Sequence, residues 1–164
     1  MNDPANKILI YTFYNWNKKS YKFLRTAELP GCNKIYIRNV QEAHRLAKHI
    51  TLSNYTIVLG IADHNKNAKK HRVETTFQNR YGKSEIVKDG RDVYVPTLII
   101  QPSESLYYAK SSTNGPCNRS GYLIAKTIEE KKLKTRFGFV HVNKNLPEKE
   151  LKNDIQSFIA KGKV

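Results

Sequence analysis

The sequence predicts an α/β fold, a three-layer α/β/α sandwich with a mostly parallel, mixed central sheet and a β-hairpin excursion. Two strand–helix–strand units fill the first 62 residues, and such units build parallel sheets that are covered on both faces. A turn signal, Lys88-Asp89-Gly90, separates two short β-like segments in the middle of the chain. An apolar strand and an amphipathic helix follow near the end, so the α/β pattern resumes there.

The first half contains three strands and two helices. Apolar, β-rich runs and alternating patterns predict strands at Lys7–Phe13, Lys34–Asn39 and Tyr55–Ala62. Helical spacing of apolar residues predicts helices at Lys18–Leu29, which Pro30-Gly31 ends, and at Val40–Leu52.

The second half begins with the hairpin excursion and ends with a second set of sheet and helix elements. The expected elements are a strand at Lys69–Phe77, hairpin strands at Ser84–Val87 and Asp92–Val95, a short strand at Ser105–Lys110, a helix at Asn118–Lys132, a strand at Arg136–Val142 and a terminal helix that starts at Leu146-Pro147-Glu148. With 164 residues and no internal repeat or linker, we expect one domain over residues 1–164.

The chain is strongly basic, with 29 Lys and Arg against 14 acidic residues and a net charge of +15. Such a charge favours polyanions, so a nucleic-acid-binding domain is one hypothesis. The basic residues are spread out and do not alternate with stacking aromatics, so we do not expect a nucleic-acid partner. No apolar run approaches the roughly 20 residues of a membrane span. The N-terminus shows no secretory signal, which predicts a cytoplasmic protein without a membrane partner.

The two cysteines, Cys32 and Cys117, lie far apart in the sequence. In a chain without a secretory signal, such a pair is weak support for a disulfide. Together with five scattered histidines they show no zinc-ligand spacing. We therefore predict neither a metal nor a cofactor.

Cys117 and His141 have the order of a cysteine nucleophile and its base. Asn114-Gly115-Pro116 forms a turn signal directly before Cys117, and a helix N-terminus stabilises a thiolate. His141 lies on the next predicted strand, where an imidazole can accept the thiol proton. A structural reading is also open, because a single cysteine at a helix start and a single histidine in an apolar strand are commonly parts of the core.

These residues and several others resemble a known family, the pyroglutamyl peptidases (pyrrolidone-carboxylate peptidases), of which this chain would be a short and divergent member. The matching stretches around the dyad are Ser112–Asn118, Tyr122, Gly138–Val142 and Leu146-Pro147-Glu148. In the first half they are Lys7–Ile10, Thr12–Trp16, Leu59–Ala62 and Tyr94–Leu98. The resemblance covers most of the chain, and the stretches keep the family's order.

The resemblance implies a cysteine exopeptidase that removes N-terminal pyroglutamate from peptides. Cys117 would be the nucleophile and His141 the general base. Phe13 and Trp16 would be flat aromatic walls around the lactam ring of the substrate. Arg80 falls near the family's oxyanion arginine, and a homo-oligomer is implied as well.

The family's third catalytic residue is a carboxylate, and the corresponding position here is His71. Side chains alternate along a strand, so Glu74 should face away from the side that position 71 presents, and Asp63 is a loop alternative. Pro116 also removes one backbone N–H beside the nucleophile. These departures leave a second hypothesis open, a family member with reduced or lost catalysis and a binding role.

Overall fold

A computed structural model describes residues 7–14, 18–65 and 67–162. Its helices are α1 (Lys18–Thr26), α2 (Val40–Ser53), α3 (Pro116–Glu130) and α4 (Glu148–Lys161). Its strands are β1 (Ile8–Phe13), β2 (Cys32–Ile37), β3 (Ile57–Asp63), β4 (His71–Val73), β5 (Phe77–Gln78), β6 (Val93–Tyr94), β7 (Leu106–Tyr108) and β8 (Arg136–Val142). No helix among the described residues is long and apolar enough to cross a bilayer.

The central sheet has six strands in the order β2-β1-β3-β8-β4-β7. The strands β2, β1, β3 and β8 run parallel, whereas β4 runs antiparallel to β8 and β7 runs parallel to β4. The predicted mixed, mainly parallel sheet is therefore confirmed. The inner parallel strands β1, β3 and β8 are apolar and buried on both faces, because helices cover both sides.

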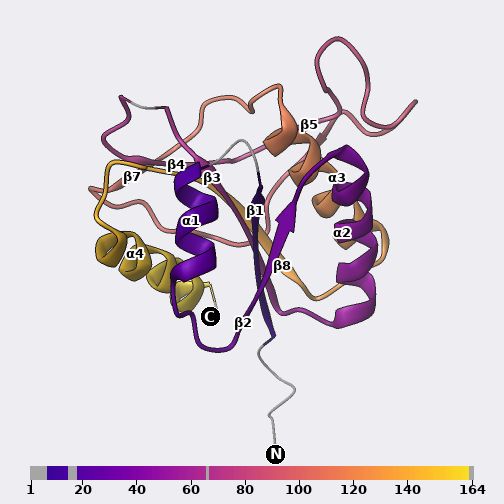
Figure 1. Ribbon diagram of the computed structural model, residues 1–164. Coiled ribbons are helices and arrows are strands. Elements are labelled where there is room, and N and C mark those ends of the chain that lie inside the picture. Colours follow the sequence, from indigo (N-terminus) through magenta and orange to yellow (C-terminus); the bar gives the residue numbers. More distant parts are fainter. Residues whose placement is uncertain (1–6, 15–17, 66, 163–164) are drawn as a thin grey trace, which may run out of the picture.

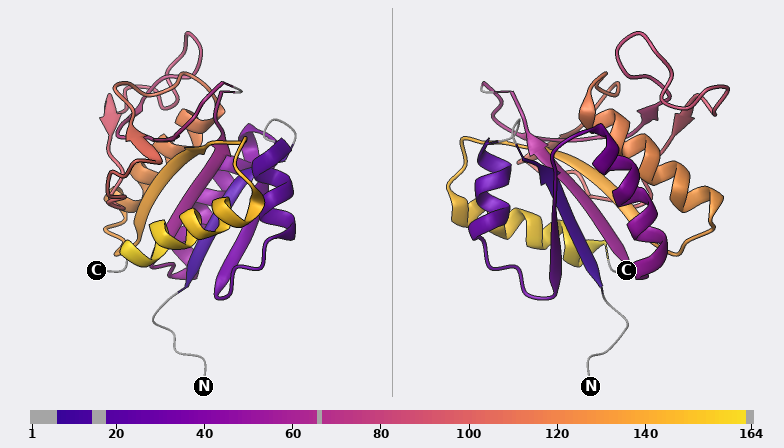
Figure 2. Two further views of the ribbon diagram at one scale, coloured as in Figure 1. Left: turned by 90° about the vertical axis from the view of Figure 1, so that its left-hand side faces the viewer. Right: turned by 45° about the vertical axis from the view of Figure 1, so that its right-hand side comes forward.

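Helices α1 and α4 cover one face of the sheet, and α2 and α3 cover the other (Figure 1). In Figure 2, α4 runs across its face of the sheet. Alternation along β1 sends Leu9 and Tyr11 into the core beneath α2 and α3, and Ile8 and Ile10 into the core beneath α1 and α4. Because side chains alternate along a strand, odd- and even-numbered residues of β1 pack against different pairs of helices.

The middle of the chain differs from the predicted hairpin. Strand β4 is much shorter than Lys69–Phe77, and β5 pairs with β6 in a separate two-stranded sheet. The segment Ser84–Val87 is not a strand. Its backbone is held by the side chain of Asn79, whose Oδ1 accepts hydrogen bonds from the amides of Ile86 (3.0 Å) and Val87 (2.8 Å). A buried amide side chain thus satisfies the backbone groups that a strand partner would otherwise bind.

Candidate active site

Cys117 occupies the first turn of α3, at the edge of the sheet where the parallel strands end. Gly115 is the N-cap and Pro116 takes the first helical position, where a missing N–H costs nothing. Ser120 stabilises this turn, because its hydroxyl donates to the Cys117 carbonyl (3.0 Å) and contacts the Tyr11 hydroxyl (3.1 Å). The thiol is therefore placed on a rigid helix start at the strand ends, where open α/β sheets carry their sites.

Asn118, the next residue, connects α3 to the turn after β5. Its amide nitrogen donates to the carbonyls of Gln78 (2.9 Å) and Arg80 (2.7 Å), and its Oδ1 accepts from the Gln78 amide (2.8 Å). Asn118 is 2% exposed. Three buried hydrogen bonds from one side chain fix the start of α3 against the hairpin excursion.

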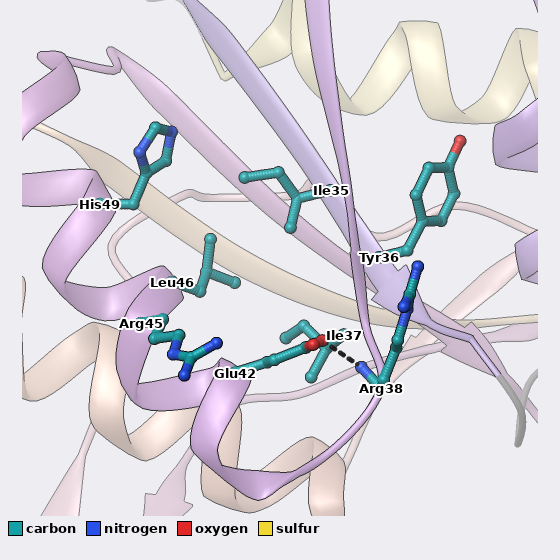
Figure 3. A pocket seen from close by; sticks show the side chains of 8 residues that line it. All are labelled: Ile35, Tyr36, Ile37, Arg38, Glu42, Arg45, Leu46 and His49. Atoms are coloured by element: carbon teal, nitrogen blue, oxygen red, sulfur yellow. Dashed lines mark hydrogen bonds between the residues drawn. The ribbon is translucent and has the colours of Figure 1, made fainter.

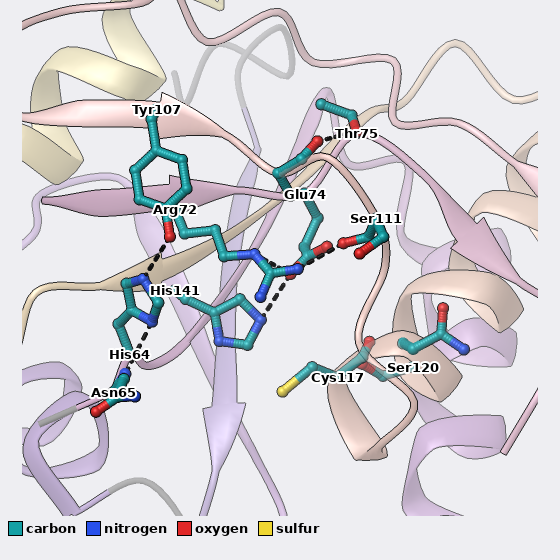
Figure 4. Close-up of polar contacts among 12 residues, drawn as sticks. His64, Asn65, Arg72, Glu74, Thr75, Tyr107, Ser111, Cys117, Ser120 and His141 are labelled. Carbon is teal, nitrogen blue, oxygen red and sulfur yellow. Dashed lines mark hydrogen bonds and ion pairs between the residues drawn. The ribbon is translucent and has the colours of Figure 1, made fainter. Parts of the chain in front are cut away.

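His141 lies near the end of β8 and faces the α2–α3 layer. Its ring packs on Phe139, with centroids 5.3 Å apart, and the residue is 7% exposed. Figure 4 shows the imidazole and the Cys117 side chain on the same side of the sheet. The expected nucleophile and base are thus brought into one site.

Glu74 is the carboxylate that meets His141. Its Oε1 lies 2.9 Å from His141 Nε2, and the residue is 2% exposed. The two atoms are close enough for an ion pair when the imidazole is protonated, but they lack the alignment of a hydrogen bond. The Glu74 amide donates to the Phe139 carbonyl (3.0 Å), so its backbone continues the pairing of β4 with β8. The carboxylate is therefore held by the sheet itself.

His71, the residue expected at the third catalytic position, does not lie beside His141, and Glu74 lies there instead. His71 is fully buried under α4, where its Nε2 donates to Asp154 Oδ2 (2.9 Å) and its Nδ1 accepts from the Asn143 amide (2.9 Å). The physical reason is strand parity. The side chains at positions 71 and 74 do point to opposite faces of the sheet. The Glu74 side chain points to the face that carries His141, whereas the His71 side chain points to the face that α4 covers.

Asp63, the loop alternative, has a structural role at the end of β3. Its carboxylate accepts hydrogen bonds from the Lys19 amide (3.1 Å) and from the Ser20 amide (2.8 Å) and hydroxyl (2.7 Å). A carboxylate is favourable at a helix N-terminus, so Asp63 stabilises the start of α1.

His64, which follows β3, borders the other side of His141, with ring centroids 6.1 Å apart. Its Nδ1 accepts from the Asn65 amide (2.8 Å), and its Nε2 contacts the Tyr107 hydroxyl at 2.9 Å. Burial lowers the pKa of His64, and the neighbouring His141 and Arg72 lower it further. His64 is therefore a neighbour of the His141 ring whose neutral form is favoured.

The environment of Cys117 keeps its thiol protonated. Burial and then the Glu74 carboxylate raise its pKa from 9.0 to about 12, against smaller opposing effects of its own amide N–H and of Arg72. Alkylation of Cys117 by iodoacetamide should therefore be at least tenfold slower at pH 7 to 8 than that of a free cysteine. The rate should rise about tenfold per pH unit up to pH 10, because the thiolate is the reacting species.

This prediction is checked by mass spectrometry in a Cys32→Ala background, so that one thiol reports. A small peptide thiol in the same tube is the control. A rate at pH 7 above that of the peptide thiol, or a plateau near neutral pH, would contradict it and would indicate a preformed thiolate.

The three residues expected to bind substrate have different outcomes. Phe13 is 2% exposed and packs against Tyr11 and Phe139, so it supports the core behind the site. Trp16 lies outside the described residues. Arg80 is exposed on the turn after β5, and its Nε donates to the Gly82 carbonyl (3.1 Å).

Sequence reasoning considered Glu74 but set it aside, and it missed Arg72. Arg72 is the cross-strand partner of His141, and its Nε lies 3.5 Å from Glu74 Oε1 (Figure 4). The sequence does show that Arg72 and Glu74, two positions apart, point to the same face of a strand. Placing that face next to His141 requires the register between β4 and β8, which two segments far apart in the sequence do not reveal by themselves.

A hollow of about 440 Å³ lies elsewhere, between β2 and α2 (Figure 3). Ile35, Leu46 and the side chains of Arg38, Glu42 and Arg45 contribute to its lining. It does not include Cys117, Glu74 or His141, so the reacting groups are not found in this hollow. Within the described part of the chain, no cluster of three or more His, Cys, Asp or Glu residues could hold a metal ion.

Comparison with solved structures finds the same fold in pyroglutamyl peptidases. Pyroglutamyl peptidase I from Bacillus amyloliquefaciens matches with a TM-score of 0.79 at 12% identity, over 97% of this chain and 95% of that chain. Pyrrolidone carboxyl peptidase from Thermococcus litoralis matches with a TM-score of 0.77 at 12% identity, over 96% and 93%. A variant of the Pyrococcus furiosus enzyme matches with a TM-score of 0.75 at 14% identity, over 94% and 97%.

No protein-family model matches the chain, and no curated protein matches it in sequence. The resemblance predicted from the sequence is therefore confirmed at the level of the fold.

Proposed function

We propose that the protein is a cysteine exopeptidase of the pyroglutamyl peptidase type, which hydrolyses the amide bond after an N-terminal pyroglutamate. The observation that carries this proposal is the Glu74–His141 contact of 2.9 Å on the same side of the sheet as Cys117. A nucleophile, a base and an orienting carboxylate are the groups that acyl transfer requires. The fold of the pyroglutamyl peptidases adds support, because it matches nearly the whole chain.

In the proposed reaction, the Cys117 sulfur attacks the carbonyl carbon of the pyroglutamyl residue while His141 takes the thiol proton. A C–S bond forms, and collapse of the tetrahedral intermediate breaks the C–N bond. His141 gives its proton to the leaving amine. Water, deprotonated by His141, then hydrolyses the thioester, which releases pyroglutamate and restores the thiol.

Glu74 would stabilise the imidazolium that forms in each proton transfer and keep the ring oriented. Because the resting thiol is protonated, the proton must move to His141 during the attack. The amide of Cys117 lies in the first turn of α3, where amides have no partner within the helix, so it is a candidate donor to the developing oxyanion. Pro116 provides no such donor.

The test is release of a fluorophore from pyroglutamyl-aminomethylcoumarin. We expect turnover by the wild-type protein and a loss of at least 10³-fold in Cys117→Ala, since the proposed thioester forms on the Cys117 sulfur. Alanyl- and prolyl-aminomethylcoumarin control for substrate class and should be hydrolysed much more slowly. Turnover that is the same in Cys117→Ala, or absent at millimolar substrate, would refute the proposal.

A second candidate function is a family member that binds without turnover. The buried thiol with its raised pKa favours it, as does the imperfect alignment of Glu74 with His141. This candidate predicts that a pyroglutamyl peptide raises the melting temperature of the protein, while no product forms over hours.

A further inference from the structure

The candidate site contains a cation with no assigned role, the guanidinium of Arg72. Its Nε lies 3.5 Å from Glu74 Oε1, and its Nη2 donates to the Ser111 carbonyl at 2.5 Å. We infer that Arg72 is a positioning residue of the active site, which holds Glu74 beside His141 and supplies the positive charge that stabilises the Cys117 thiolate. This inference rests on the proposed role of Cys117 as nucleophile.

The pairing of β4 with β8 places Arg72 in the site. Arg72 is the direct cross-strand partner of His141, and Glu74 follows two positions later on the same face. Directly opposite residues of an antiparallel pair have their Cβ atoms about 5 Å apart. Arg72, Glu74 and His141 therefore form one cluster that backbone pairing sets.

The burial of Glu74 requires a cation. Both carboxylate oxygens are buried and lack a hydrogen bond among the described residues. A buried carboxylate without a partner is costly, so its charge has to be balanced by ion pairs. The ion pairs recorded for Glu74 in the described chain are those with Arg72 and His141. Since His141 exchanges its proton in each cycle, Arg72 is the permanent counter-charge.

The hydrogen bond to Ser111 connects this cluster to the nucleophile. Ser111 lies in the segment that leads into α3 and Cys117. The same segment is bound at a second point just beyond the end of β4, where the Thr75 hydroxyl donates to the Ala109 carbonyl (2.9 Å). Arg72 thus bridges the strand that carries the carboxylate and the segment that carries the thiol.

The charges around Cys117 fit this role. Burial and then the Glu74 carboxylate raise the pKa of the Cys117 thiol, and the Arg72 guanidinium lowers it. The His141 ring and the Tyr11 hydroxyl are the other titratable groups near the thiol. Arg80, the arginine expected from sequence, is directed to the Gly82 carbonyl instead. Of these two arginines, Arg72 is the one that lies in the cluster with Glu74 and His141.

The test measures the alkylation rate of Cys117 between pH 7 and 10 in a Cys32→Ala background. We expect Arg72→Gln to slow alkylation about three- to tenfold at pH 9 and to shift the profile to higher pH, because a nearby positive charge is lost. Arg72→Lys should recover at least half of the logarithmic loss, since it restores the charge. Arg91→Gln, which removes a charge from a surface ion pair with Glu129, is the matched control and should react like wild type.

An unchanged alkylation rate in Arg72→Gln with a wild-type melting temperature would overturn the inference. So would an equal slowing in Arg80→Gln, or a failure of lysine to restore any of the rate. If Arg72→Gln does not fold, Arg72→Lys alone decides, because a twofold to threefold slowing is then expected and a wild-type rate refutes it.

Peptidase turnover is measured in parallel and separates the two proposals. A wild-type protein without turnover but with the expected alkylation pattern refutes the proposed function and leaves Arg72 as the thiolate-stabilising cation. A wild-type protein with turnover and a normal alkylation rate in Arg72→Gln refutes only the role of Arg72.

Discussion

Replacing Glu74 with glutamine should lower kcat/KM for a pyroglutamyl amide by about 10²- to 10³-fold, mainly through kcat. The substitution keeps the shape of the side chain but removes the charge that stabilises the His141 imidazolium at 2.9 Å. Steady-state kinetics with the fluorogenic substrate measure the effect, and circular dichroism checks the fold. Because the glutamine stays in a buried position between Arg72 and His141, the effect on substrate binding should be small.

His71→Gln is the matched control, because His71 is the residue that the sequence placed in the third position. It should change kcat/KM of the folded protein by less than about threefold. It should also lower the free energy of unfolding by about 1–3 kcal/mol, since buried hydrogen bonds to Asp154 and Asn143 are disturbed. A loss of activity in His71→Gln as large as in Glu74→Gln would return the catalytic role to His71.

Adding a single methyl group at Gly60 should lower the free energy of unfolding by about 2–3 kcal/mol. Gly60 lies in the middle of β3, with Tyr11 and Phe139 as its partners on β1 and β8. The two rings close over the glycine, so a Cβ there would lie 2.3 Å from Phe139 Cδ2 and 2.7 Å from Tyr11 Cζ. Urea denaturation of Gly60→Ala, followed by fluorescence, measures the loss.

Phe139→Val provides the rescue. Valine has no δ or ε carbon, so it removes the Cδ2 and Cε2 atoms that the new methyl group would meet. The double variant should therefore be more stable than the sum of the two single losses predicts, by at least 1 kcal/mol. Strict additivity of the two substitutions would show that the clash is relieved elsewhere. The outcome also concerns the site, because Phe139 packs directly against His141.

The parts of the fold that the sequence predicts well are those with local patterns. The apolar runs that form β1, β3 and β8 need cover on both faces, so each is recognisable by itself. Helix α2 begins at Val40 as expected, and its start is capped by neighbouring residues: the Asn39 side chain accepts from the Glu42 amide, and the Glu42 carboxylate accepts from the Arg38 amide. The hairpin excursion was placed wrongly in detail, since the Asn79 side chain, not a neighbouring strand, binds the backbone at Ile86 and Val87.

The site shows the same division. The sequence predicts Cys117 and His141 as candidates because each lies at a recognisable helix start or strand end. The inference that Glu74 and His71 point to opposite faces is correct, but it took His71 as the residue beside His141. Which of two alternating faces points to His141 depends on the register of β4 against β8. Long-range register is set by tertiary packing, so a short strand such as β4 contains too little local pattern to reveal it.

The position of β8 has a consequence for the order of folding. This strand is the last of the sheet along the chain, yet it lies between β3 and β4. Until residue 142 has been synthesised and has left the ribosome, β2-β1-β3 and β4-β7 have no strand to join them. Closing the sheet requires contacts between distant parts of the chain, which form slowly. The nascent chain therefore exposes two apolar sheet edges until late in translation. His141 lies on β8, so it is placed beside Glu74 and Cys117 only when this strand completes the sheet.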